Sequence, residues 1–273
     1  MGPSVPSEVS SRQIIARFGH LAIWAGLYIG GAIVVLHERS GARHTLVEFG
    51  AGFFLGVSVY LTDRAKWLDA HLDPGDLASD ERRHVFLRRH APIIRPAMLV
   101  GAGTSAIMLA CIDWRLVVLV PGSICGVIAY AWRSRTSTRR RARVKDVLLL
   151  KNLAVATSIT MLAGAIVLAS EGSLAPSPVL TLLLIVLGDA ILCDLDDREA
   201  DLAYGTNTLP TTFGPVVTWI VALALHVGAC TMLPWTWGAI LIATDLALMA
   251  LPHRRDAVDA RLGLAGLVLV LLP

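Results

Sequence analysis

Residues 179–214 read V-L-T-L-L-L-I-V-L-G-D-A-I-L-C-D-L-D-D-R-E-A-D-L-A-Y-G-T-N-T-L-P-T-T-F-G, an apolar run that leads directly into a segment rich in carboxylates. More than a quarter of the chain's 21 acidic residues lie in this stretch. Asp194, Asp197 and Asp201 have the spacing D-x-x-D-x-x-x-D, and steps of three and four residues return to the same face of a helix. Three carboxylates on one face repel one another unless a cation lies between them. The spacing therefore indicates a cation site, and the alternative is a solvated acidic loop.

The composition of the whole chain indicates a membrane protein. The 273 residues are 55% apolar and 16% charged, with a mean hydropathy of +0.65, which is too apolar for an ordinary soluble domain. The charged residues fall in blocks that are separated by long apolar runs. A helix needs roughly 20 mostly apolar residues to cross a hydrocarbon core about 30 Å thick, and several runs meet that length. We therefore expect an all-α polytopic membrane protein.

We expect about nine transmembrane helices, packed in a bundle around a central cavity within a single domain of residues 1–273. The last of them is short, so this helix is expected to be partial or tilted. The predicted spans are 18–36, 46–61, 96–112, 116–131, 147–169, 177–193, 215–233, 236–251 and 262–272.

The placement of the basic residues sets the expected orientation. With the N-terminus inside, 21 of the 24 lysines and arginines lie on the cytoplasmic side. This agrees with the known excess of basic residues in cytoplasmic loops. The loops 62–95 and 194–214 then both face the cytoplasm. The basic run 133–145 is expected to set topology and contact anionic lipid. Nucleic-acid binding is not expected, because neither interleaved aromatic side chains nor a soluble domain accompanies this run.

The loop 62–95 begins with a second charged cluster. Asp63, Arg64 and Lys66 lie at the membrane edge, where an unpaired charge is costly, and Asp69 follows. One interpretation is a group of snorkelling charges that ends the helix. The other is a second set of carboxylates, with interleaved cations that hold an anion.

Polar residues also lie within the apolar spans. Lys151 and Asn152 lie at the start of the fifth span, and a lysine in a membrane is expected to face a cavity or a carboxylate unless it snorkels to the interface. His226 and Asp245 lie near mid-membrane, where they either pair with each other or line the same cavity. The four cysteines are interpreted as small core residues, without a disulfide framework or a zinc site.

The predicted topology places the two acidic clusters on the same side of the membrane. Carboxylate and water ligands suit Mg²⁺, which commonly keeps substrate phosphate oxygens among its ligands. Two facing aspartate clusters, flanked by arginine and lysine above an apolar bundle, are typical of a receptor for a lipid diphosphate. The metal would neutralise the leaving diphosphate while the apolar spans hold a hydrocarbon tail.

The segment from Asp194 to Gly214 resembles the second aspartate motif of the UbiA superfamily of intramembrane prenyltransferases. That motif reads D-x-x-D-x-x-x-D, then glycine, then T-L-P and a further glycine. The nine-span architecture and the acidic clusters resemble the family over essentially the whole chain. The positions that match the second motif in order are Asp194, Asp197, Asp201, Gly205, Thr208, Leu209, Pro210 and Gly214.

The first motif of the family, N-D-x-x-D-x-x-x-D, is altered in this chain. With Asp63 at its first aspartate, Thr62 stands at the asparagine and Lys66 at the second aspartate. An alignment on Asp69 and Asp73 instead places Lys66 at the first aspartate. We prefer Asp63 and Asp69, because Asp63 lies nearest the membrane boundary. Lys66 could then contact the diphosphate directly and take over part of the role of one metal ion.

The resemblance implies Mg²⁺-dependent ionisation of an isoprenyl diphosphate and transfer of the prenyl group to an aromatic or other lipophilic acceptor. It also implies roles for individual residues, with Asp196 and Glu199 as bystanders. Asp194, Asp197 and Asp201 would bind Mg²⁺ with the diphosphate, helped by Asp63 and Asp69. The diphosphate oxygens would be held by Arg64, Lys66 and Lys151. The allylic carbon or the acceptor would face Tyr130, Asn152 and Tyr204.

Three alternatives use the same residues differently. A terpene cyclase of the same superfamily would trap the carbocation within the substrate and need no acceptor. A non-catalytic relative would bind lipid or a partner without reaction. A transporter would use polar residues inside the bundle, such as Asp189, His226 and Asp245, but the sequence has no inverted repeat to support it.

Overall fold

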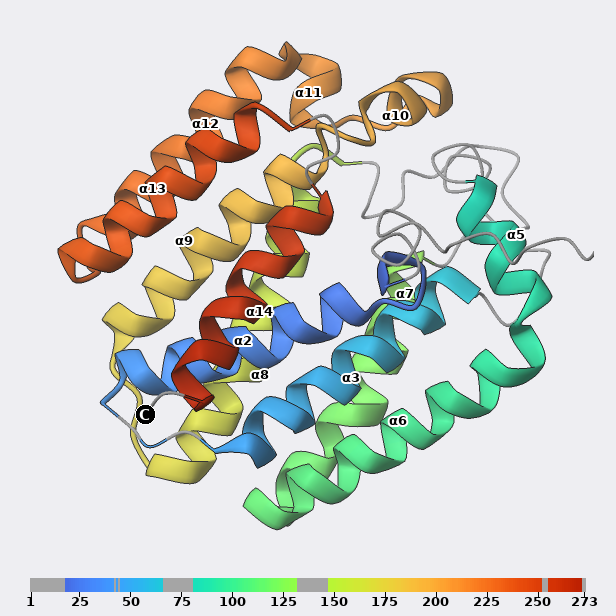
Figure 1. Cartoon of the computed structure of the whole chain (residues 1–273), viewed down its shortest axis with the longest axis vertical. Coiled ribbons are helices and arrows are strands. Elements are labelled where there is room, and N and C mark those ends of the chain that lie inside the picture. Colours follow the sequence, from blue (N-terminus) through green and yellow to red (C-terminus); the bar gives the residue numbers. More distant parts are fainter. Residues whose placement is uncertain are drawn as a thin grey trace, which may run out of the picture.

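The computed structural model describes residues 18–41, 43, 45–65, 81–131, 147–251 and 255–271, and among these residues it contains helices and no strand (Figure 1). The all-α prediction is therefore confirmed. The helices in chain order are α2 (Ile23–Arg39), α3 (Leu46–Ala65), α5 (Glu81–Arg89), α6 (Ala91–Ile112), the 3-10 helix η2 (Trp114–Val118), α7 (Leu119–Ala131), α8 (Leu150–Glu171), α9 (Pro176–Cys193), α10 (Arg198–Tyr204), α11 (Leu209–Thr212), α12 (Gly214–Cys230), α13 (Trp235–Met249) and α14 (Arg255–Leu271).

Glycine and proline mark the helix ends. Helix α8 stops at Gly172, which has a φ of 70° and donates its backbone N–H to the carbonyl oxygen of Leu168. Helix α9 begins with Pro176 in its first turn, where the missing N–H has no partner to lose.

Each predicted span coincides with a helix or helix pair, but the predicted start of the last span is wrong. Helix α14 begins at Arg255 and not at residue 262, so Arg261 is a helix residue and not part of a loop.

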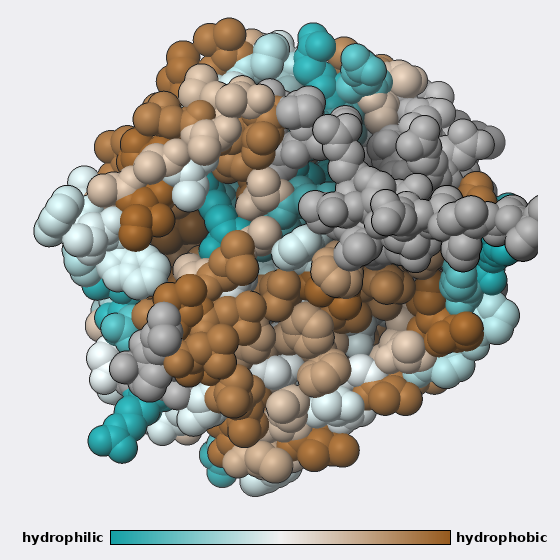
Figure 2. Space-filling view, viewed as in Figure 1, coloured by the Kyte–Doolittle hydropathy of each residue, from teal (hydrophilic) through white to brown (hydrophobic). Residues whose placement is uncertain are grey.

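Helices α3, α6, α8 and α9 are long and apolar enough to cross a membrane, judged by length and composition. The apolar helices 114–129, 214–230 and 235–249 are shorter, so the count of nine crossings stays a prediction. Large apolar side chains on α6, including Leu99 and Ile107, point out of the bundle. Figure 2 shows hydrophobic residues over much of one face, with hydrophilic residues gathered at the edge where α10 lies. Such a surface suits contact with lipid chains.

Helix α2 lies at the centre of the bundle and packs most extensively against α14 and α3. The crossing of α2 with α14 depends on glycine. A Cβ atom on Gly31 would lie 2.1 Å from the carbonyl oxygen of Leu262, and one on Gly266 would lie 2.4 Å from the Cα of Gly31. Small residues at such crossings let two backbones approach closely in a membrane. This close contact places α14 deep in the bundle.

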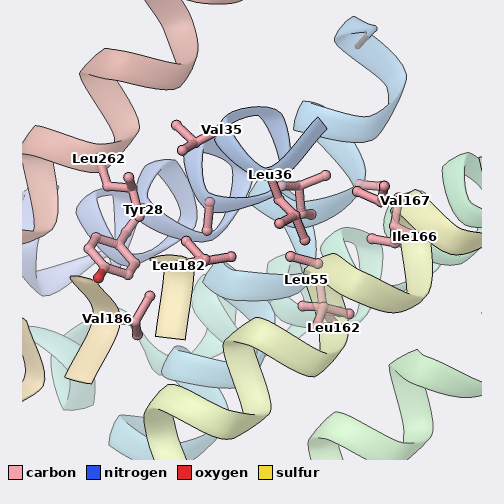
Figure 3. Packing of buried hydrophobic residues seen from close by; sticks show 14 of the residues in the cluster. Tyr28, Val35, Leu36, Leu55, Leu162, Ile166, Val167, Leu182, Val186 and Leu262 are labelled. Atoms are coloured by element: carbon pink, nitrogen blue, oxygen red, sulfur yellow. The ribbon is translucent and has the colours of Figure 1, made fainter. Parts of the chain in front are cut away.

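The largest apolar cluster joins α2, α3, α8, α9 and α14 (Figure 3). Leu36, Leu55, Ile166 and Leu182 are essentially inaccessible to solvent. Tyr28 packs on the same cluster and keeps its hydroxyl at the edge. The packing fixes α8, α9 and α14 relative to one another, and it therefore fixes the helix ends from which the candidate site is built.

Candidate active site

Asp194 ends α9 and is buried, with 2% of its surface exposed. Lys151 Nζ lies 2.7 Å from its Oδ1, and Asn152 Nδ2 lies 3.0 Å from its Oδ2. Both donors come from the first turn of α8, so two consecutive residues bind the two oxygens of one carboxylate. A buried carboxylate requires such partners, because an unpaired buried charge is costly. The structure thus brings together three residues that the sequence analysis selected.

Asp197 lies in the turn between α9 and α10, and the guanidinium of Arg255 pairs with its carboxylate. Burial by itself would raise the pKa of Asp197, but the positive charges of Arg255 and then Lys151 hold that pKa below its usual range. The neighbouring Asp196 accepts a hydrogen bond of 2.9 Å from the backbone N–H of Arg255. Two adjacent aspartates therefore hold the first residue of α14.

Asp201 lies in α10 and differs from the other two motif aspartates. Its Oδ2 atom is buried and has no hydrogen-bond partner among the described residues. The pKa of Asp201 is raised to about 6, mainly by burial and also by the charges of Asp197 and Asp194, while Lys151 opposes the rise. Asp201 thus has a carboxylate oxygen that can bind a cation.

The residues after Asp201 shape the loop. Gly205 has a φ of 71°, a conformation that glycine adopts without strain, and it ends α10 by donating its N–H to the carbonyl oxygen of Asp201. Thr208 and Thr211 form a capping box at the start of α11, with Thr208 N 2.9 Å from Thr211 Oγ1. Pro210 follows within the first turn. The glycine, threonine and proline of the motif therefore have a backbone role.

The end of α3 supplies Asp63 and Arg64, which are both partly buried. The Arg64 guanidinium lies over the ring of Tyr60, with 5.2 Å from its central carbon to the ring centroid, and its Nε is buried without a partner among the described residues. Its charge also helps to lower the pKa of Asp197. Arg64 thus lies close enough to residues 194–201, which we call the acidic turn, to act on their charges.

Four predicted site residues cannot be placed fully. Lys66 and Asp69 lie outside the described residues. Tyr130 and Tyr204 belong to α7 and α10 by backbone, and their side chains lie outside the described part of the chain. Arg255 is not among the predicted site residues. The signal was the charged block 253–256, which lies between the last two predicted spans.

A second polar cluster lies inside the bundle. His226 Nδ1 is 2.7 Å from Asp245 Oδ2, so these two residues pair. Arg261 binds Asp245 at 2.6 Å through Nη1 and pairs with Asp189 through Nη2. The hydroxyl of Tyr28 donates to Asp189 at 2.7 Å. The cluster ties α2, α9, α12, α13 and α14 together, and its members are one another's partners.

The acidic turn can be tested for its fit to Mg²⁺. Within the described ranges, no three histidine, cysteine or acidic side chains converge on a common point that could hold a metal ion. Mg²⁺, however, is usually bound through one or two carboxylates together with substrate phosphates, and does not need a cage of protein ligands. The unpartnered Oδ2 of Asp201 supplies one such oxygen. The turn therefore fits a Mg²⁺ ion that is shared with a phosphate group.

The fold and the site define a helical membrane protein with an acidic turn where α8, α9 and α14 meet. The model of the UbiA prenyltransferase family matches residues 89–261, more than half of the chain. The chain therefore belongs to the UbiA prenyltransferase family, and it is an integral membrane protein.

Two solved structures share this fold. One is the structure of a UbiA homolog from Archaeoglobus fulgidus bound to DMAPP and Mg2+, with 14% identity, a TM-score of 0.51, and coverage of 95% of this chain and 98% of that chain. The other is the structure of a UbiA homolog from Archaeoglobus fulgidus, with 12% identity, a TM-score of 0.54, and coverage of 94% and 95%. The comparison with curated proteins gives no match.

Proposed function

We propose that this protein is a Mg²⁺-dependent membrane enzyme that ionises an isoprenyl diphosphate and transfers the prenyl group to an aromatic or other lipophilic acceptor. The observation that carries the proposal is the arrangement around Asp194. One carboxylate of the D-x-x-D-x-x-x-D motif is held by Lys151 and Asn152. Asp201 has a buried oxygen without a partner among the residues that the structure describes. Support also comes from a structure of similar fold, a UbiA homolog bound to DMAPP and Mg2+.

In this proposal Asp201, with Asp197 and Asp194, would hold the metal, which supplies positive charge to the diphosphate as it leaves. Lys151 has 24% of its side chain exposed, and its ammonium group has three donors, so it would bind a diphosphate oxygen in addition to Asp194. Arg64 would add a second cation from the end of α3. Because the C–O bond breaks to leave a carbocation and a diphosphate anion, clustered cations favour that charge separation.

The remaining predicted roles belong to the same proposal. Lys66 would bind diphosphate oxygens, with Asp63 and Asp69 close to the metal. Tyr130, Asn152 and Tyr204 would face the allylic carbon or the acceptor. The N-terminus and the loops 62–95 and 194–214 would face the cytoplasm, and the apolar bundle would hold the prenyl chain away from water.

The test uses the purified protein in lipid nanodiscs. It is incubated with Mg²⁺ and farnesyl or geranylgeranyl diphosphate, with and without aromatic acceptors, and pyrophosphate release is measured. We expect release that depends on Mg²⁺ and on an acceptor. Release without an acceptor, together with a hydrocarbon product, would instead identify a terpene cyclase.

Two variants sharpen this test. Asp201→Asn removes the charge and keeps the shape, and should lower the rate on the order of 100-fold. Asp113→Asn is the matched control, because Asp113 lies at the turn between α6 and η2 and accepts from the backbone N–H of Arg115. Absence of diphosphate consumption for both chain lengths, with no difference in prenyl-diphosphate binding between wild type and Asp201→Asn, would exclude the enzyme.

A further inference from the structure

The three motif aspartates differ in what neutralises them. Asp194 has a donor on each oxygen, from Lys151 and Asn152. Asp197 pairs with the guanidinium of Arg255, and Asp201 keeps its Oδ2 without a partner among the described residues. The guanidinium of Arg255 therefore lies against the carboxylate of Asp197, where a bound metal ion would also have to lie. A metal ion that takes Asp197 as a ligand has to compete with Arg255.

The attachment of Arg255 allows its side chain to change partner. Its backbone N–H donates to Asp196 at 2.9 Å, so the first residue of α14 is held through the main chain. Its side chain binds separately, to Asp197. The guanidinium can therefore leave Asp197 by rotation about side-chain bonds while Asp196 keeps the start of α14 in place. Both groups of this ion pair retain some exposure, 22% for Arg255 and 19% for Asp197, which leaves room for such a rotation.

The other charges around Asp197 make a bare metal ion unfavourable. Arg64, Lys151 and Arg255 all act on this one carboxylate. A divalent cation that approached the carboxylate of Asp197 alone would find its charge already offset by these three side chains. A diphosphate brings negative charge of its own and has oxygens that can accept from a guanidinium, often in a bidentate pair. Metal and diphosphate together are therefore far better matched to this turn than the metal by itself.

We propose that Arg255 is an additional binding residue that exchanges partners, neutralising Asp197 before ligands bind and a diphosphate oxygen afterwards. The exchange makes metal binding conditional on the diphosphate, because only the diphosphate draws Arg255 away from Asp197. This inference rests on the proposed function, since it takes an isoprenyl diphosphate as the ligand. Reciprocity requires that metal and diphosphate raise each other's affinity by the same factor.

The first measurement is metal binding without diphosphate. Mn²⁺ replaces Mg²⁺, and electron paramagnetic resonance reports the free ion during titration of the full chain in nanodiscs. We expect Arg255→Gln to bind Mn²⁺ about tenfold more tightly than wild type, the lower end of the effect that one neighbouring charge has on a carboxylate. An unchanged or weaker Mn²⁺ affinity would overturn the proposed competition.

The second measurement has the opposite expected sign. Farnesyl thiolodiphosphate, which resists ionisation, is titrated at saturating Mg²⁺. Arg255→Gln should bind it about tenfold more weakly, because a charge-assisted contact to the diphosphate is lost. Equal affinity in wild type and variant would show that Arg255 does not take the diphosphate as its second partner. The two opposite shifts cannot both arise from general loss of structure, which would weaken both affinities.

Two further variants complete the design. Arg198→Gln changes the same residue type at the start of α10, where the Arg198 Nε donates to the carbonyl oxygen of Pro210 at 3.1 Å, and should leave both affinities unchanged. Arg255→Lys keeps the charge and the N–H donated to Asp196, and should keep the wild-type Mn²⁺ affinity. If Arg255→Lys raised the Mn²⁺ affinity as much as Arg255→Gln, the effect would come from side-chain shape and not from charge, and the proposal would be overturned.

If wild type consumes isoprenyl diphosphates while Arg255→Gln leaves Mn²⁺ binding unchanged, the inference fails and the proposed function stands. Failure of wild type to bind the thiolodiphosphate contradicts the proposed function itself.

Discussion

Lys151 Nζ lies 2.7 Å from Asp194 Oδ1, which joins the first turn of α8 to the end of α9 across 43 residues of sequence. The pair fixes one corner of the acidic turn, and Asn152 on the other oxygen fixes its orientation. A lysine inside an apolar helix start thus has a specific carboxylate partner. This relationship gives the first of four predictions.

Lys151→Met should remove both a charge partner of Asp194 and a candidate diphosphate contact. The buried carboxylate would keep only Asn152, and we expect a loss of about 2 kcal/mol in unfolding free energy, below the range for fully buried pairs because Lys151 is partly exposed. Thermal unfolding in detergent measures this loss. The double variant with Asp194→Asn should be less destabilised than the sum of the single variants, and strict additivity would contradict the pair.

Arg261→Leu should be more damaging than Lys151→Met. It leaves the carboxylates of Asp189 and Asp245 buried with fewer partners, and we expect a loss of about 3 to 5 kcal/mol. Asp189→Asn and Asp245→Asn in the same chain should restore part of that stability, because they remove the unpaired charges. Arg115→Gln, in the turn between α6 and α7, is the control and should be near neutral. Equal melting temperatures for Arg261→Leu and this control would refute the role of the network.

Gly31→Leu should disrupt the crossing of α2 with α14. Its Cβ would lie 2.1 Å from a backbone oxygen, so the two helices must separate, at a cost of about 3 kcal/mol or more. Gly103→Leu is a matched control on α6, where a Cβ meets nothing within 4 Å. Thermal unfolding should separate the two variants clearly. A melting temperature for Gly31→Leu equal to that of the control would show that the close crossing is not required.

Gly205→Ala and Gly172→Ala form a matched pair. Both glycines end a helix with φ near +70° and open space around the Cβ position, so each alanine should cost about 1 kcal/mol of backbone strain. Only Gly205 follows the motif aspartates, so only its variant should also reduce pyrophosphate release and binding of farnesyl thiolodiphosphate. Equal activity of the two variants would contradict the backbone role assigned to the motif glycine.

The helical class and the approximate helix positions could be predicted from the sequence, because long apolar runs allow few other structures in a membrane. Asp194, with its partners Lys151 and Asn152, could be selected because charged and polar side chains are conspicuous in apolar runs. The partner of each charge could not be predicted, since pairing depends on how helices rotate and cross. Arg261 illustrates this, because the apolar pattern starts only after it and assigned it to a loop.

The role of Arg255 was hidden for a related reason. The acidic residues lie within one stretch, where spacing can be examined, but their cations come from three other helices. No short-range pattern connects Arg255 to Asp197, which lies 58 residues earlier. The glycine crossing of α2 with α14 is equally non-local, although the glycines themselves are visible in the sequence. Such relationships require the packed bundle.

Helix α14 has a consequence for the order in which the protein is assembled. Asp189 is synthesised well before Arg261, which lies 72 residues later. Of its partners in the described part of the chain, Tyr28 is made first, and His226 and Arg261 follow Asp189. While the ribosome completes the chain, α9 carries a carboxylate whose arginine has not yet been made. The acidic turn also lacks Arg255 during that interval. Helix α9 and the acidic turn therefore lack both arginines until α14 has been made, and the candidate site is complete only after that.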